Sequence, residues 1–381
     1  MIPILWYGHF GQIPTMDEPA SLFSFFDELK DPRHHRTQKH PMESLVFISI
    51  AAIVCGADTW NEIESFGLAK AAWLSTMLPL PNGIPSHDTF NRFYAALAPG
   101  EFETCFVQWA ASLSVRGNGE VVNIDGKTVR GSKGLNSSAA HIVTAWSSAN
   151  TVSLGQLRTD DKSSEITAIP QLIKMLFLEG CIVTIDAAGC QTKIVEAIVE
   201  KKADYLLQVK ANQPKLLDAI EQSFALQPFD QSWEETDADH GRITTRTCSV
   251  TDDLERVPKV DKWPGLQTLV RVDSHTYFKA SKKTAEMTRY YITSLPPKAK
   301  LIGQTARTHW QIENGLHWQL DVSFREDASR KRKDNAAVNF SSLLKMTLTM
   351  LKRDTTTKIG IKSKRLKAGW DNDYLLQVLN L

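Results

Sequence analysis

The spacing of hydrophobic and polar positions divides the chain into three kinds of segment. Residues 17–115 carry apolar positions at helical spacing, interrupted by proline- and glycine-containing loops. Residues 119–226 alternate short apolar runs of strand length with amphipathic helical stretches. Residues 228–298 are rich in Thr, Val and Tyr, and helical spacing resumes near Gln304. The pattern predicts a small all-α N-terminal domain, then a mixed α/β domain that contains a β-rich insertion.

This pattern also predicts individual elements and boundaries. We expect strands at 120–125, 141–147, 152–158, 181–186 and 204–209, helices at 166–178, 191–202 and 214–226, and insertion strands at 243–250, 268–273 and 289–294. We expect a disordered extension at 1–16, a helical DNA-binding domain at 17–115, a catalytic domain at 116–350 with its insertion at about 228–298, and a basic C-terminal tail at 351–381.

Two of the predicted strands end in an acid. The apolar run from Val121 leads to Asp125, and the run from Cys181 leads to Asp186. A carboxylate is costly to bury unless it has a partner or a metal, and two carboxylates at one sheet edge repel each other unless a proton or a cation lies between them. The simpler alternative is that Asp125 only caps the turn at Gly126.

A third acid lies on a predicted helix after the insertion. His309, Glu313, His317 and Asp321 are four residues apart, so they share one helix face, which tryptophans flank. His and acid at this spacing can bind zinc. Alternatively, Asp125, Asp186 and Glu313 supply the oxygen ligands that hold two Mg²⁺ or Mn²⁺ ions around a phosphodiester. The simplest alternative is that these four residues form an exposed polar helix face and bind no metal.

Composition and charge narrow the class of protein. The net charge is only +1, but thirteen Lys/Arg stand against four Asp/Glu between Arg325 and Lys367. This local excess favours a phosphate-binding surface over a solvated helix face. The five cysteines show no CxxC spacing, which indicates a reduced cytoplasmic protein. No apolar run is long enough to span a membrane.

Several motifs together resemble one protein family. They lie between about residues 20 and 350 and are Asp31-Pro32-Arg33, Gly83 to Phe90, Ile124 to Ser132, Lys162 to Ile166, Asp186-Ala187, Val209 to Gln213, His240-Gly241-Arg242, His309 to Asn314, Leu316-His317-Trp318, Leu320-Asp321-Val322 and Glu326-Asp327. The chain resembles bacterial insertion-sequence transposases of the DDE type, and within them the H-repeat-associated group linked to Rhs elements.

The resemblance implies an RNase H-like catalytic domain whose acids correspond to Asp125, Asp186 and Glu313. It implies that the protein cleaves double-stranded DNA at the ends of the element and joins them to target DNA, using two Mg²⁺ or Mn²⁺ ions. It also implies that the protein acts in the bacterial cytoplasm without a membrane partner, and it is compatible with a homo-oligomer on DNA. The chain departs from related transposases at the positions four before and seven after the helical Glu, which are His309 and Leu320 here rather than Arg and Lys.

Phosphate contacts are expected from basic and polar residues near these motifs. The candidates are Lys127, Arg130, Lys210, Asn212, His309, Lys331, Arg332 and Lys333. Two other functions remain open at this point. One is a nuclease of the same fold without strand transfer, and the other is a domesticated DNA-binding protein without catalysis.

Overall fold

The computed structural model describes residues 22–113, 117–134, 138–159, 164–226, 230–239 and 241–380. The extension expected at 1–16 lies outside these residues. The chain forms two compact units, each built from separate stretches of sequence. Unit 1 comprises Met1–Ser112, Val129–Ala140 and Trp318–Leu381, and unit 2 comprises Leu113–Thr128 and His141–His317.

Unit 2 is organised around a nine-stranded mixed sheet with the strand order β3-β2-β1-β4-β5-β9-β8-β7-β6. Its strands are β1 (Val121–Val129), β2 (Ala140–Ser147), β3 (Val152–Thr159), β4 (Ile182–Ile185), β5 (Asp204–Val209), β6 (Gln231–Asp239), β7 (Arg242–Thr251), β8 (Thr268–Phe278) and β9 (Lys283–Thr293). β1, β4 and β5 are parallel neighbours, and β2 pairs antiparallel with β3. The fold-class prediction of an RNase H-like α/β domain is confirmed.

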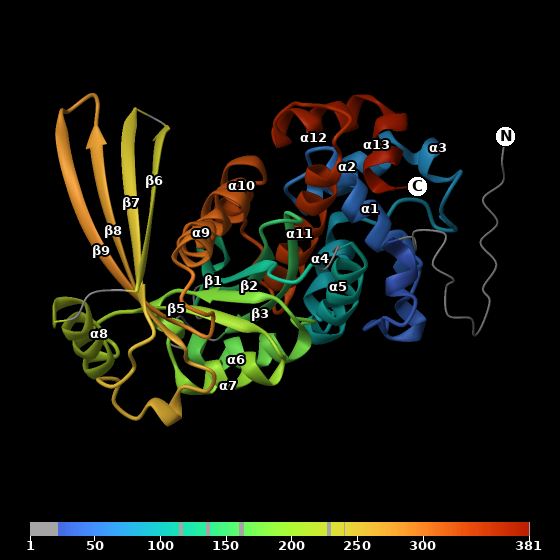
Figure 1. Cartoon of the computed structure of the whole chain (residues 1–381). Coiled ribbons are helices and arrows are strands. Elements are labelled where there is room, and N and C mark those ends of the chain that lie inside the picture. Colours follow the sequence, from blue (N-terminus) through green and yellow to red (C-terminus); the bar gives the residue numbers. More distant parts are fainter. Residues whose placement is uncertain are drawn as a thin grey trace. The chain divides into compact units, whose positions relative to one another are not determined.

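Helices cover both faces of the first five strands. Figure 1 shows α6 (Glu165–Met175) and α7 (Thr192–Glu200) on one face and α9 (Ala299–His309) on the other. α8 (Pro214–Leu226) follows β5. The strands are buried between these layers, which is why their sequences read as continuous apolar runs rather than alternating ones.

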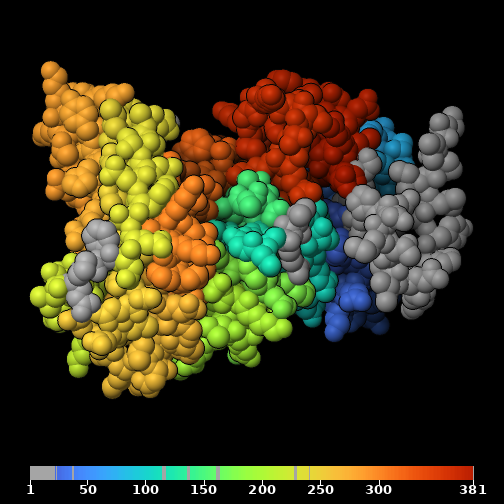
Figure 2. Space-filling model, in the orientation of Figure 1, coloured from blue at the N-terminus to red at the C-terminus, as the bar shows by residue number. Residues whose placement is uncertain are grey.

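The insertion contains four long antiparallel strands, β6 to β9, joined to the rest of the sheet through β5 and β9. They form the yellow-to-orange ridge at the left of Figure 2. The sequence predicted three of these strands. β6 was not predicted because its sequence is acidic and mostly exposed. α9 packs tightly on this sheet: a side chain at Gly303 would lie 2.8 Å from the Trp233 ring.

Unit 1 is helical. Its α-helices are α1 (Met42–Val54), α2 (Trp60–Ala69), α3 (Ala71–Leu74), α4 (His87–Ala96), α5 (Pro99–Leu113, whose last residue belongs to unit 2), α10 (Trp318–Ser323), α11 (Ala336–Arg353), α12 (Ile361–Trp370) and α13 (Asn372–Leu379). α1 is apolar and buried for almost its whole length, so it is the central helix of this unit. Ser86 caps α4 as its sequence predicts, through a 3.4 Å bond from the Thr89 amide to the serine hydroxyl.

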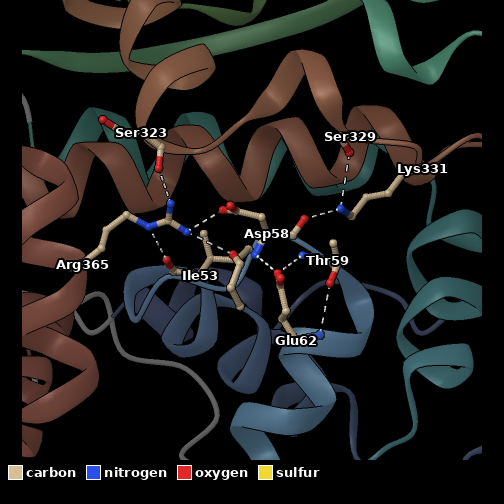
Figure 3. A network of polar contacts seen from close by, with 9 residues as sticks. Ile53, Asp58, Thr59, Glu62, Ser323, Ser329, Lys331 and Arg365 are labelled. Carbon is tan, nitrogen blue, oxygen red and sulfur yellow. Dashed lines mark hydrogen bonds and ion pairs between the residues drawn. The ribbon is translucent and has the colours of Figure 1, made fainter.

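A buried polar network holds the C-terminal part of unit 1 to its N-terminal part (Figure 3). Arg365 of α12 donates to the carbonyl oxygens of Ile53, Ala57 and Ser323 and to the carboxylate of Asp58. Next to it, the Nζ atom of Lys331 donates to the Asp58 carbonyl at 2.8 Å. The segment expected as a basic tail therefore contains helices that pack into this unit. Among the described residues, no helix is both long and apolar enough to cross a membrane.

Candidate active site

Strand register places the first two predicted acids side by side along the sheet. Ile124 of β1 pairs with Ile185 of the parallel strand β4, and each is followed directly by an acid. Asp125 continues β1, whereas Asp186 ends β4 and caps the short helix that follows by accepting a 3.0 Å bond from the Ala188 amide. The two apolar strands thus place their carboxylates next to each other at the same end of neighbouring parallel strands.

The third predicted acid lies beside Asp125. Glu313 and His317 are the first and last residues of a π-helical segment, Glu313–His317. The Nδ1 atom of His317 lies 3.5 Å from Oδ2 of Asp125 and 3.7 Å from Oε2 of Glu313. One ligand atom from each of these three residues fits within a 4.8 Å cluster, and Asp186 is outside it. π-turns inside helices occur frequently at functional sites.

The electrostatics of this cluster reflect burial and mutual repulsion. The pKa of Asp125 is raised to about 6, chiefly by burial and also by the charges of Glu313 and Asp186, while His317 acts against the shift. The pKa of Glu313 is lowered, chiefly by its interaction with the neighbouring His317 side chain, while burial acts against this. A carboxyl group whose pKa is shifted by burial together with charged neighbours is typical of a functional site.

The side chains of Asn123, Thr184 and His309 form a chain of hydrogen bonds next to the carboxylates. The Thr184 hydroxyl donates to Oδ1 of Asn123 at 2.7 Å, and Nδ1 of His309 lies 2.9 Å from the same hydroxyl. Because that hydroxyl proton is used on Asn123, His309 is the donor in the second bond. Burial lowers the pKa of His309, so the ring is neutral with its proton on Nδ1. Asn123 and Thr184 each precede a candidate acid by two residues, on the same strand face.

The opposite face of β1 carries a second pair that the sequence analysis did not identify. His141 and Glu165 are both buried, and their side chains form a short ion pair between Nε2 and Oε1. Thr128 bonds the other ring nitrogen of His141 at 2.8 Å. An added Cβ at Gly126 would lie 2.2 Å from the Glu165 carboxylate, so only glycine fits there. The glycine in the motif and a histidine within an apolar strand were the available signals.

The donor set fits a divalent cation. Two carboxylates and an imidazole nitrogen converge, and the Nε2 atom of His317 is buried without a hydrogen-bond partner in the described part of the chain. Carboxylate oxygens suit Mg²⁺ and Mn²⁺, and imidazole suits transition metals. The polar stripe predicted on one helix therefore divides: His309 bonds into the sheet, while Glu313 and His317 face Asp125.

Four of the predicted DNA contacts lie in unit 2. Lys127 is close enough to Glu313 for its charge to lower the pKa of that acid. Lys210 is exposed at the end of β5, whereas Asn212 donates to the carbonyl of Ala187, directly after Asp186. His309 bonds Thr184, as described above. Asn212 and His309 are therefore engaged in holding the site, and Lys127 and Lys210 are better placed to meet a phosphate.

The other four lie in unit 1. Arg130 is largely exposed and pairs with Asp327 at 3.5 Å, and Lys333 is exposed. Arg332 is exposed and donates to the carbonyl of Gly131 at 3.2 Å. Lys331 is buried, and its ammonium lies 3.4 Å from the centre of the Phe340 ring. This burial argues against a phosphate contact by Lys331.

Burial recurs along the basic segment that contains Lys331. Lys345, Lys364 and Arg365 are also buried in unit 1. Lys364 donates to the Leu351 carbonyl and pairs with Asp354 at 3.3 Å. The excess of positive charge between Arg325 and Lys367 is thus partly internal, and it is not a continuous phosphate-binding surface. Counting charges along the sequence overestimated this surface because the count carries no information about burial.

A cleft in unit 2 leads to Glu313 and was not predicted. It has a volume of about 950 Å³ and lies between the insertion strands, α9 and the π-helical segment. Its walls include Arg242, Arg246, Arg289 and Arg307 and the aromatic residues Trp233, Phe278, Tyr291 and Trp310. Arg289 lies over the Trp310 ring, 5.3 Å from its centre. Arg307 and Arg246 share the carboxylate of Asp237. Basic and aromatic residues together favour a nucleic-acid surface.

Comparisons with known proteins agree with these features. A family described as "Transposase DDE domain" matches residues 116–350, and one described as "DDE_Tnp_1-associated" matches residues 23–110. YncI of Escherichia coli O157:H7, which carries a transposase name, is 40% identical over 94% of this chain and 94% of its own length. YhhI of E. coli K12, named as an H repeat-associated transposase, is 37% identical over 95% of this chain and 98% of its own length.

Among solved structures, the chain is similar to a piggyBac transposase that was solved by cryo-EM in a synaptic complex with hairpin DNA. The TM-score is 0.45 and the identity 11%, over 94% of this chain and 76% of the other.

Proposed function

Because this chain belongs to the DDE transposase family, we propose that Asp125, Asp186 and Glu313 are its catalytic carboxylates and that it cuts and joins DNA. The observation that carries the proposal is the convergence of Asp125 and Glu313 beside the strand that ends in Asp186. These residues are far apart in sequence, and the site lies at the end of the cleft with basic and aromatic walls.

In this proposal the three carboxylates hold two Mg²⁺ or Mn²⁺ ions. When bound, such ions lower the pKa of water and offset negative charge on the attacking and leaving oxygens of a phosphodiester. Asp125 and Asp186 orient the ions from the sheet, and Glu313 completes the set from the π-helical segment. His309 and Asn123 hold the strand ends so that the carboxylates keep their geometry.

Two reactions on phosphorus follow. In the first, water attacks a phosphodiester at the end of the element, and the broken P–O bond leaves a free 3′-hydroxyl and a 5′-phosphate. In the second, that 3′-hydroxyl attacks a phosphodiester of the target, forms a new P–O bond and releases a 3′-hydroxyl of the target strand. Lys127 and Lys210, together with the arginines of the cleft, neutralise phosphate charge during both steps.

The partner is double-stranded DNA, both at the ends of the element and at the target, and the protein works on it in the bacterial cytoplasm. A homo-oligomer assembled on DNA would bring two ends together. Lys331 is not included among the phosphate contacts because it is buried, whereas Arg130, Arg332 and Lys333 are exposed and are kept as candidates from unit 1.

The test is a joint assay of binding, cleavage and joining with purified protein, Mg²⁺ and DNA that carries the element's inverted repeats. We expect Asp125→Asn to bind DNA at least as well as the unaltered protein, because a negative charge near phosphate is removed, and to lose cleavage by more than about 10²-fold. Asp261→Asn, at an exposed position of the same unit, is the matched control and should keep cleavage.

Each rival function predicts a different result. Cleavage by the unaltered protein without any joined product would favour a nuclease without strand transfer. Binding without cleavage, in the presence of Mg²⁺ or Mn²⁺, would favour a domesticated DNA-binding protein. Cleavage at the unaltered rate by Asp125→Asn would refute the assignment of Asp125.

A further inference from the structure

We propose that His317 is a metal ligand of this site through Nδ1, so that one ion is held by a mixed set of nitrogen and oxygen donors. This inference rests on the proposed function for the presence of an ion, and it adds a residue and a metal preference to it. The DDE set predicts oxygen ligands only. A nitrogen ligand would make the site favour Mn²⁺ over Mg²⁺.

The distances around His317 fit a shared cation better than a hydrogen bond. Its Nδ1 atom lies 3.5 Å from the Asp125 carboxylate and 3.7 Å from the Glu313 carboxylate. Direct N–H···O bonds have typical lengths of about 2.7–3.2 Å. Two ligand atoms that each lie about 2.1 Å from one ion are separated by about 3.0–3.5 Å. The 3.5 Å separation from Asp125 therefore matches two ligands of one ion, and the 3.7 Å separation from Glu313 is slightly longer.

The burial of His317 points the same way. Its side chain is 8% exposed, and its Nε2 atom has no hydrogen-bond partner among the residues that the structure describes. Leaving a buried polar atom unpaired costs about 1–3 kcal/mol. Nothing in the packing of the described residues compensates for that cost at Nε2. A bond from Nδ1 to a cation leaves the proton on Nε2 and does not pair that atom, but its favourable free energy would offset the cost of the unpaired N–H.

The backbone explains how Glu313 and His317 reach the same side. In a π-helical turn the backbone bonds run from residue i to i+5, so the five residues Glu313–His317 form little more than one turn. Its first and last side chains consequently both approach Asp125 on β1. The segment is a local departure from the α-helix that the sequence predicted, and it lies at the ligand cluster.

The kinds of donor atom at the site determine whether it binds Mn²⁺ or Mg²⁺ more tightly. Mg²⁺ prefers oxygen ligands in near-octahedral geometry, whereas imidazole nitrogen is a common ligand of transition-metal ions. Adding one nitrogen therefore raises affinity for Mn²⁺ relative to Mg²⁺. Asp186 lies outside the three-residue cluster, so it remains available to a second ion with oxygen ligands alone.

The experiment measures metal binding directly, without DNA and without an activity readout. Mn²⁺ is titrated into the purified full-length protein and followed by electron paramagnetic resonance, and pulsed measurements detect ¹⁴N coupled directly to the bound Mn²⁺. We expect this coupling in the unaltered protein, its loss in His317→Gln, and a rise of about 10- to 100-fold in the Kd for Mn²⁺. The Kd for Mg²⁺, measured by competition, should change less than the Kd for Mn²⁺.

His309→Gln is the matched control, because His309 is the other histidine near the carboxylates and its Nδ1 is engaged with Thr184. It should keep the nitrogen coupling. His317→Asp supplies an oxygen in place of nitrogen, and it should bind Mn²⁺ without any ¹⁴N signal. Should His317→Gln fail to fold, ¹⁵N-histidine labelling of the His309→Gln variant tests whether a histidine other than His309 supplies the nitrogen, because the coupling must then change from ¹⁴N to ¹⁵N; unchanged ¹⁴N coupling would overturn the role of His317.

The outcomes separate this inference from the proposed function. Persistence of the coupling in His317→Gln, or an unchanged Kd for Mn²⁺, would overturn the role of His317. If Asp125→Asn lost Mn²⁺ binding while His317→Gln kept it, the carboxylate site would stand and only the histidine ligand would fail. If Asp125→Asn also bound Mn²⁺ normally, the proposed site itself would be refuted.

Discussion

The Nη2 atom of Arg365 lies 2.8 Å from Oδ1 of Asp58, although 307 positions separate the two residues in the chain. The same guanidinium caps three backbone carbonyls of unit 1 and lies 4.3 Å from the centre of the Phe324 ring. Arg365 is almost completely buried, so these groups are withdrawn from water together. A charge that sequence analysis assigned to DNA binding is a structural link between α12 and the loop before α2.

Removing that link should destabilise unit 1 strongly. Arg365→Met leaves Asp58 and three carbonyls without their donor, and breaking a buried ion pair from one side costs about 3–5 kcal/mol. Urea unfolding, followed by tryptophan fluorescence and circular dichroism, measures the change. Lys362→Met alters an exposed cation of the same helix and should shift the midpoint little. Equal midpoints for both variants would show that the Arg365 hydrogen bonds make no net contribution to the free energy of unfolding.

The burial of Lys331 should make stability depend on pH. Burial lowers its pKa to about 7, from an ordinary value near 10.5, although Asp58 and Glu62 act against the shift. Between these values the unfolded chain binds more protons than the folded one, so unfolding free energy should rise with pH across this window. The contact with Phe340 favours the charged form and reduces the effect, so we expect a gain of about 1–3 kcal/mol.

Urea midpoints at pH 7 and pH 10, compared with those of Lys331→Met, measure this contribution. The variant should show the smaller increase, because it has no proton to lose at this position. Lys333→Met is the control at an exposed neighbouring lysine and should follow the unaltered protein. Parallel pH profiles for Lys331→Met and the unaltered chain would contradict the expectation.

A methyl group at Gly126 should disturb the site through the opposite face of β1. In Gly126→Ala the new Cβ would lie 2.2 Å from Glu165 and 2.7 Å from His141, so this ion pair or the strand must shift. Overpacking of this kind costs about 1–3 kcal/mol. Because Asp125 is the preceding residue, Mn²⁺ affinity should fall as well. Gly117→Ala, where no atom lies within 4 Å, is the control for both measurements and should change neither.

DNA affinity should depend more on the cleft than on Lys331. Replacing Arg242 and Arg289 with Gln should weaken binding to all sequences alike and flatten the dependence on salt by up to about 0.9 per lost phosphate contact. Lys262→Gln, an exposed cation of unit 2 outside the cleft, is the control. Titrations at several salt concentrations provide the slope. A slope that is unchanged in the double variant would exclude the cleft as a phosphate surface.

The sequence predicts those elements whose pattern is local, and it does not predict contacts between residues that are far apart in the chain. The strands that carry Asp125 and Asp186 were predictable because each is a local apolar run that ends in an acid. β6 was not, because its acidic, exposed sequence is held as a strand by pairing with β7 rather than by its own propensity. The pair of His141 and Glu165 joins residues 24 positions apart, and no local period links them.

The candidate site likewise contains residues that the sequence predicts and contacts that it does not. The three acids were found from motif and strand-end position, and their assignment as catalytic residues remains a prediction. The sequence placed Glu313 and His317 on one helix face, but it did not predict the approach of His317 to Asp125, because that contact joins residues that are distant in the chain. Burial of Lys331 and Arg365 was missed because opposite charges and carbonyl partners come from distant helices.

The pairing of β5 with β9 has a consequence for the order in which the protein can form during synthesis. β5 ends at Val209, but its antiparallel neighbour is not complete until Thr293. Until then the nascent chain exposes an unpaired strand edge, and Glu313 is added later still. A ribosome that stops within the insertion therefore releases a fragment with both strand-borne acids but no glutamate beside them. The late arrival of Glu313 means that the candidate site can assemble only after the whole insertion has been synthesised.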